Sequence, residues 1–124
     1  MAKQTAEEMF EERLAELINT ETGLNDLVGT IRKSDLLWDF GTIRQLSNDL
    51  LGDMSCATGC EKVEDFDANL GLIAKKLILL ADALREAKKE ARKEKDTVAL
   101  DCISEAMGEI KGVRREVNAL LPEV

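Results

Sequence analysis

The sequence predicts an all-α fold, an antiparallel bundle of four long helices that we expect to self-associate. Apolar residues recur in alternating steps of four and three along nearly all of the 124 residues, and this spacing keeps side chains on one face of a helix. The only proline is Pro122, so the body of the chain is compatible with long helices. A chain of this length forms about one domain, and we assign residues 1–124 to a single helical-bundle domain. Its helices are predicted at approximately 5–33, 35–57, 65–94 and 97–121.

The first predicted helix begins near Thr5. Thr5 and Glu8 have the S/T-x-x-E spacing of a capping box. The stretch "NTETG" at residues 19–23 is weakly helical and places Glu21 in the apolar stripe, so the helix could break there and divide the bundle into five segments. The stripe of this helix contains Phe10, Leu14, Leu17, Glu21, Leu24, Val28 and Ile31.

The second predicted helix follows Ser34 or Asp35, since either residue can cap its N-terminus. Trp38, the only tryptophan, lies early in this helix, and we expect it to cover one end of the core. A partner-facing anchor is the alternative role for Trp38, because tryptophan is favoured at binding hot spots. The stripe of this helix contains Leu36, Phe40, Ile43, Ser47, Leu50 and Met54.

The third and fourth predicted helices carry the longest apolar stripes. Asp96 or Thr97 can cap the start of the fourth helix, and Pro122 ends it. The third stripe contains Phe66, Leu70, Ile73, Leu77, Leu80, Leu84, Ala87 and Ala91. The fourth contains Ala99, Ile103, Ala106, Ile110, Val113, Val117 and Leu120.

Two leucines of the third helix lie away from its stripe. With about 100° between successive residues, Leu72 and Leu79 fall within roughly 60° of Lys75, among charged residues that include Lys76. Either other helices of the same chain surround this helix, or the leucines contact a second chain. Because a four-helix bundle of this size cannot easily surround one member, we expect a partner interface that includes Leu72, Leu79, Lys75, Lys76 and Trp38.

Several glycines lie beside stripe residues. Each glycine in a helix interior is less favourable than alanine by about 1 kcal/mol, and a small residue beside a seam allows two helices to approach closely. We expect such an approach at Gly29, Gly41, Gly71 and Gly112.

The stretch "SCATGC" at residues 55–60 places Cys56 and Cys60 four positions apart. A thiol redox pair is one interpretation, for which Gly59 would supply backbone freedom. The other interpretation is structural: Cys56 packs near the end of the second helix, Gly59 ends that helix in the left-handed conformation, and Cys60 lies in the loop. We expect Cys102 to be buried. An odd number of cysteines excludes a complete disulfide framework and favours a reduced, cytoplasmic protein.

The residue content argues against an enzyme. The chain has no histidine, so Ser-His-Asp and Cys-His arrangements are absent. Three cysteines without histidine cannot complete the four N or S ligands of a structural zinc site within one chain, and a zinc site would need ligands shared in a homodimer. The sequence also lacks the ligand motifs of haem and calcium sites. We therefore expect no catalytic residue, no metal and no cofactor.

The net charge of −8 is concentrated in residues 34–70, which contain two basic and eight acidic side chains. Nucleic-acid binding needs Lys and Arg to displace counterions, so we expect no direct nucleic-acid contact. No apolar run approaches the length of a membrane-spanning helix, so we expect no membrane contact either. The acidic segment could occupy the nucleic-acid site of a basic target, as small inhibitors from phages or mobile elements do. Its candidate surface residues are Asp49, Asp53, Glu61, Glu64, Asp65 and Asp67.

These observations favour one function over two alternatives. The leading prediction is a non-enzymatic interaction, adaptor or regulatory protein that binds another protein through helical surfaces, with a homodimer favoured. The alternatives are a small acidic antagonist of a basic, nucleic-acid-binding target and a thiol redox sensor.

Overall fold

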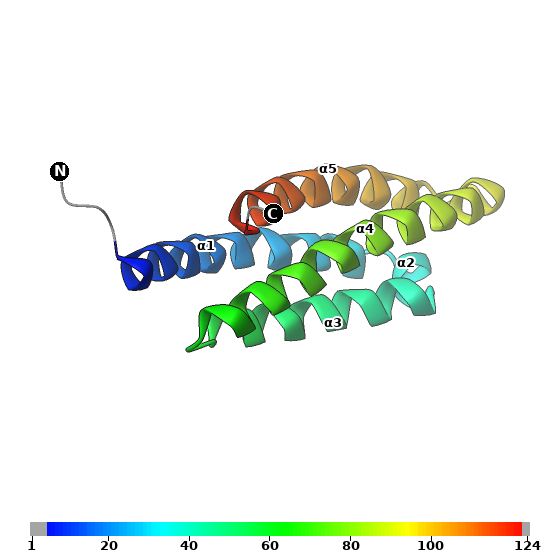
Figure 1. Cartoon of the computed structure of the whole chain (residues 1–124). Helices are drawn as coiled ribbons and strands as arrows, with labels where there is room; N and C mark the ends of the chain where they lie inside the picture. The colour runs from blue at the N-terminus through cyan, green and yellow to red at the C-terminus, as the bar shows by residue number, and fades with distance from the viewer. Residues whose placement is uncertain (1–4, 123–124) are drawn as a thin grey trace.

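The computed structural model describes residues 5–122, and this part of the chain forms five α-helices and no β-strand (Figure 1). The helices are α1 (Ala6–Arg32), α2 (Asp35–Asp39), α3 (Gly41–Thr58), α4 (Val63–Glu94) and α5 (Thr97–Leu120). The predicted all-α bundle is therefore confirmed, with α1, α3, α4 and α5 as its four long members.

The four long helices form two layers. In one layer α3 packs against α4, and in the other α1 packs against α5 (Figure 1). The layers meet mainly where α4 packs on α5, with a smaller contact between α1 and α3. Successive long helices run in opposite directions, as expected for helices joined by short connections.

The core follows the predicted stripes. All stripe residues of α4 and α5 are buried, as are the stripe residues of α3 from Ile43 to Met54. In α1 the stripe is buried at Leu17, Leu24, Val28 and Ile31 and partly buried nearer the N-terminus. Full burial of a large aliphatic side chain stabilises the fold by roughly 1.5–3 kcal/mol, so this continuous core is the main favourable term in folding.

The helix ends follow the predicted caps. The Thr5 hydroxyl accepts a hydrogen bond from the Glu8 N–H at 3.1 Å and begins α1. Ser34 caps α2 through the Leu37 N–H at 3.3 Å. Asp96 caps α5 in the same way. Each cap satisfies one of the backbone donors that a helix start leaves unpaired.

The first helix does not break at Glu21. α1 is continuous through the weakly helical stretch 19–23, and the Thr20 hydroxyl donates a hydrogen bond to the Glu16 carbonyl. Leu17 and Leu24, on either side of the stretch, are both fully buried. Burial of these neighbours outweighs the small propensity cost, because tertiary packing supplies most of the stability of a protein helix.

The predicted second helix is instead divided at Phe40 into α2 and α3. Phe40 has an extended backbone with φ −72° and ψ 100°, and it is both the C-cap of α2 and the N-cap of α3. Gly41 follows immediately and favours a break because it is a poor helix former. The break lets α2 turn across the end of the bundle, where it contacts each of the long helices.

The short α2 covers the core as predicted for Trp38. Leu37 is fully buried, and Trp38 is partly buried and packs against the core. The Arg32 guanidinium lies over the Trp38 ring at 4.8 Å from its centroid. Such a cation–π contact fixes the ring against the end of α1.

Arg13 closes the other end of the bundle. Its guanidinium lies 5.0 Å from the Phe66 ring centroid, pairs with Asp67 and donates to the Leu120 carbonyl at 2.6 Å. One side chain thus joins α1, the start of α4 and the end of α5. The contacts of the guanidinium with a ring, a carboxylate and a helix C-terminus offset much of the free-energy cost of removing this charge from water.

Gly59 does not end α3 in the left-handed conformation. Its backbone has φ −98° and ψ 2°, a conformation that other residues also adopt. The left-handed cap occurs instead at Lys95, after α4, with φ 56° and ψ 37°. The N–H of Lys95 bonds to the Arg92 carbonyl and the N–H of Asp96 to the Ala91 carbonyl, which is the Schellman pattern.

Replacement of Lys95 by glycine should stabilise the protein. A side chain in the left-handed conformation costs roughly 1–2 kcal/mol, and glycine avoids this cost. We expect Lys95→Gly to raise the free energy of unfolding by about 1 kcal/mol in a urea titration, with an unchanged slope. The matched control is Lys95→Ala, which keeps the strained backbone and should change stability little. Equal stabilities for the two variants would contradict this account.

Candidate protein-binding surface

The solvent side of α4 carries three large aliphatic side chains that the described chain leaves nearly half exposed. Leu72, Ile78 and Leu79 are 46%, 46% and 45% exposed. The sequence pattern identified the two leucines but missed Ile78. The same helical spacing of about 100° per residue also places Ile78 outside the buried stripe, so the sequence could have identified it. We refer to this surface as the α4 outer face. It contains Ala68, Gly71, Leu72, Lys75, Ile78, Leu79 and Asp82.

The exposure of these residues decides whether other helices of the same chain cover Leu72 and Leu79. α3 and α5 pack against α4 along its buried stripe, which contains Leu70, Ile73 and Leu77. The alternative in which other helices of the same chain surround α4 therefore does not hold within residues 5–122. A partner interface stays a prediction.

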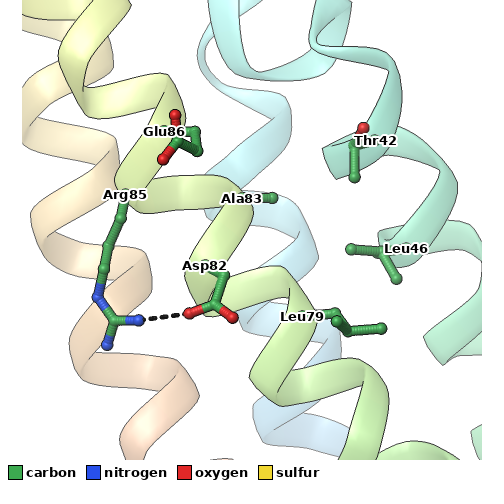
Figure 2. A pocket seen from close by; sticks show the side chains of 7 residues that line it. All are labelled: Thr42, Leu46, Leu79, Asp82, Ala83, Arg85 and Glu86. Carbon is green, nitrogen blue, oxygen red and sulfur yellow. Dashed lines mark hydrogen bonds and ion pairs between the residues drawn. The ribbon is translucent and has the colours of Figure 1, made fainter.

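A hollow of about 440 Å³ adjoins the α4 outer face on the side of α3. Figure 2 shows Leu46 of α3 and Leu79 of α4 facing each other across it. Leu46 and Ala83 give the hollow an apolar floor, since they are only 8% and 7% exposed. Charged side chains form its rim on α4, where Arg85 donates to the Asp82 carboxylate at 2.7 Å (Figure 2). The remaining lining residues are Thr42 and Glu86.

The two lysines predicted for this interface have different environments. Lys76 forms an ion pair with Asp53 of α3, with 2.6 Å between Nζ and Oδ2. This hydrogen bond raises the pKa of Lys76 above its ordinary value, against the opposing effect of burial. Lys75 is exposed and forms no ion pair with another described residue. Lys76 thus joins α3 to α4, and Lys75 is the lysine available to a partner.

Trp38 lies away from the α4 outer face. It belongs to α2, where Arg32 stacks on its ring and the core lies beneath it. The structure does not bring it together with Leu72 and Leu79, so we leave it out of the candidate surface. The prediction that Trp38 contacts a partner stays open.

The six predicted acidic surface residues do not form one free surface. Asp53 is paired with Lys76, and Asp67 is paired with Arg13 of α1 at 2.5 Å. Of the remaining four, Asp49 accepts a hydrogen bond from Gln45, Glu61 lies in the α3–α4 connection, and Glu64 and Asp65 lie in the first turn of α4. Carboxylates in a first helical turn stabilise a helix, because they interact favourably with the positive end of its dipole.

A more extended acidic surface lies where α1 packs against α5, and the sequence pattern did not identify it. Three adjoining hollows of about 390, 260 and 170 Å³ follow this contact. Lys33 is the only basic side chain among the described residues that line them. Apart from a 2.6 Å contact between the Thr30 hydroxyl and the Glu109 carboxylate, their acidic residues have no partner in other described side chains. We refer to this surface as the acidic seam, formed by Glu16, Asp26, Glu105, Glu109 and Glu116.

The cysteines are all free thiols. Cys56 is exposed, and Cys60 is partly buried with its thiol donating to the Cys56 carbonyl at 3.1 Å. The Asn69 side-chain amide donates to the Cys60 sulfur at 3.3 Å, which orients that thiol from α4. Cys102 is buried as predicted, and burial, followed by the nearby Glu105 carboxylate, raises the pKa of its thiol. The redox interpretation of Cys56 and Cys60 stays a prediction.

The environments of the cysteines predict an order of reactivity. Because the thiolate is the reactive form, burial and a raised pKa should both slow Cys102. We expect iodoacetamide to modify Cys56 at least about tenfold faster than Cys102 in the folded protein. Mass spectrometry of timed digests measures both rates, and urea should bring them together. Rapid modification of Cys102 without urea would contradict its buried position.

No cluster of three or more Cys, Asp or Glu side chains within residues 5–122 is arranged to hold a metal ion. In the same range, none of the helices combines the length and apolar character that a bilayer crossing needs. Comparisons with protein-family models, with curated proteins and with solved structures find no match.

Proposed function

We propose that this chain is a non-enzymatic interaction protein that binds another protein through the α4 outer face. The observation that carries the proposal is the presence of Leu72, Ile78 and Leu79 on one face, each nearly half exposed, with Leu79 lining an apolar hollow. Contiguous exposed apolar surface on a soluble domain commonly marks a protein interaction site. Full burial of such a side chain contributes roughly 1.5–3 kcal/mol. Because each of the three is already about half buried, a partner would add about half of that value per side chain before the costs of association.

The shape of the hollow supports a protein ligand. It is shallow, its floor is aliphatic, and charged residues stand only at its edge. This arrangement of an apolar centre and a polar rim is typical of protein interfaces. A projecting aliphatic or aromatic side chain of a partner would fill it, in the way that a hot-spot residue fills a pocket.

Charge introduced on the α4 outer face should abolish partner binding. We expect the double variant Leu72→Glu/Leu79→Glu to lose proteins that the immobilised wild type captures, because two carboxylates would become desolvated in the interface. Quantitative mass spectrometry compares the captured proteins. Both positions are exposed, so the free energy of unfolding should change by no more than about 0.5 kcal/mol.

The matched control for this experiment is Ile18→Glu. Ile18 lies on α1 and is 51% exposed, so it is as accessible as the two leucines but belongs to another surface. A captured protein that wild type and Ile18→Glu share and the double variant loses would support the proposal. Identical captured proteins for all three would refute it.

The acidic seam favours a second candidate function, the antagonist of a basic, nucleic-acid-binding protein. The supporting observation is the row of hollows along this seam. Apart from Glu109, the carboxylates that line them have no hydrogen-bond or ion-pair partner among the described side chains, and Lys33 is the only basic residue among the described lining residues. Electrostatic complementarity of this kind accelerates association and selects partners. The nucleic-acid mimicry expected from residues 34–70 has less support, because two of those six carboxylates are neutralised within the chain.

Salt and neutralisation distinguish the two candidates. If the acidic seam binds, Glu105→Gln/Glu116→Gln should release a basic partner, and binding should weaken steeply between low and physiological salt because exposed charges are screened within about 10 Å. The control is Glu64→Gln/Asp65→Asn, which removes the same charge from the start of α4. Salt-insensitive binding that survives both double variants would exclude this candidate.

A further inference from the structure

We propose that the occupant of the α4 outer face is a second copy of this chain, paired antiparallel about a two-fold axis between Ile78 and Leu79. The inference rests on the proposed function and deepens it by naming the partner. Three observations carry it: the charges on the face, the positions of its leucines relative to the hollow, and the open space at Gly71.

The charges on the face are self-complementary in this arrangement. In a two-fold interface each residue meets the residue that lies equally far on the other side of the axis. Lys75 and Asp82 lie equally far from a point between Ile78 and Leu79, so Lys75 of each copy meets Asp82 of the other. A parallel pair would place Lys75 on Lys75 and Asp82 on Asp82, and an axis at Lys75 would also oppose the two lysines. Such like-charge contacts select against both alternatives.

The apolar residues fit the same axis. With about 100° between successive residues, Leu72, Leu79 and Ala83 lie within roughly 40° of one another, on the side of α4 that bears the hollow. A two-fold axis perpendicular to the helices keeps this side matched to itself. Leu72 of one copy therefore lies opposite Arg85 of the other, which lines the hollow together with Leu79 and Ala83. At the centre, Ile78 of each copy meets Leu79 of the other.

The glycine on this face gains a role in the dimer. A Cβ at Gly71 would have no atom of another helix within 4 Å in the single chain, so its small size serves no packing within the described bundle. The proposed axis places Gly71 opposite Glu86 of the second copy. The absent side chain leaves room for α4 of that copy and for the longer side chains at its Arg85 and Glu86.

Charge exchange between two variants tests the register directly. Lys75→Glu alone places an acidic side chain against Asp82 twice in the dimer, and Asp82→Lys alone places a second lysine against Lys75 twice. Each variant should therefore self-associate at least about tenfold more weakly than wild type. An equal mixture of the two variants restores both attractive pairs and should form a heterodimer with about the wild-type affinity. Sedimentation equilibrium over a range of concentrations measures each dissociation constant.

Two further variants test the packing. Leu79→Glu should weaken the dimer at least about a hundredfold, because the substitution occurs twice in the symmetric interface and places each carboxylate against Ile78 of the other copy. Ile18→Glu should leave the dissociation constant unchanged. Circular dichroism verifies that every variant is folded.

Each outcome supports or overturns the inference. A wild-type chain that is monomeric at millimolar concentration overturns it. So does a dimer whose dissociation constant is the same for wild type, for Lys75→Glu, for Asp82→Lys and for the mixture of the two variants. If the wild type is monomeric but Leu72→Glu/Leu79→Glu still loses a captured protein, the self-association fails and the proposed function stands. If the dimer forms in this register and the double variant loses no captured protein other than the chain itself, the pairing stands and binding of a different protein fails.

Discussion

The structure depends on the burial of a single apolar stripe along α4. This stripe extends from Phe66 to Ala91, and all of its predicted residues are buried between α3 and α5. α4 forms one layer with α3 and makes the main contact with the other layer through α5. A helix in this position can bury one face and must present the opposite face to solvent. The exposed Leu72, Ile78 and Leu79 are therefore a direct consequence of how the bundle is arranged.

Local sequence spacing predicted the fold, the core and the N-caps of α1, α2 and α5, because these features are set by residues three to four apart. It failed where a distant contact decided the outcome. Burial of Leu17 and Leu24 keeps α1 continuous through Glu21. At Phe40 the helix breaks where Gly41 follows, and the contacts of α2 with all four long helices accompany this break. The same spacing predicted that Ser47 would be buried, and it is, although its hydroxyl has no partner in the described structure.

The two candidate surfaces also differ in how far they could be predicted from residues close together in the sequence. Leu72 and Leu79 could be identified from one helix alone, because their distance from the stripe is a local property. The acidic seam could not, since it forms only when α1 and α5 pair and bring their carboxylates together. A Cβ at Gly23 would lie 3.4 Å from Val113, so this is where α1 approaches α5 closely. The close approach expected at four other glycines is absent, because no atom of another helix lies within 4 Å of a Cβ at Gly29, Gly41, Gly71 or Gly112.

The α4 outer face and the acidic seam belong to different layers of the bundle, and this separates their possible uses. Residues of α3 and α4 line the hollow beside Leu79, and residues of α1 and α5 line the seam. These two pairs of helices form the two layers of the bundle (Figure 1). A dimer formed through α4 would therefore leave the seam of each copy uncovered. Two identical sites held in one assembly bind a repeated partner more tightly than either site alone, provided that the geometry allows both to engage. Self-association through the apolar face and charge-directed binding at the seam are thus compatible in one molecule, and a variant confined to one layer can remove either without removing the other.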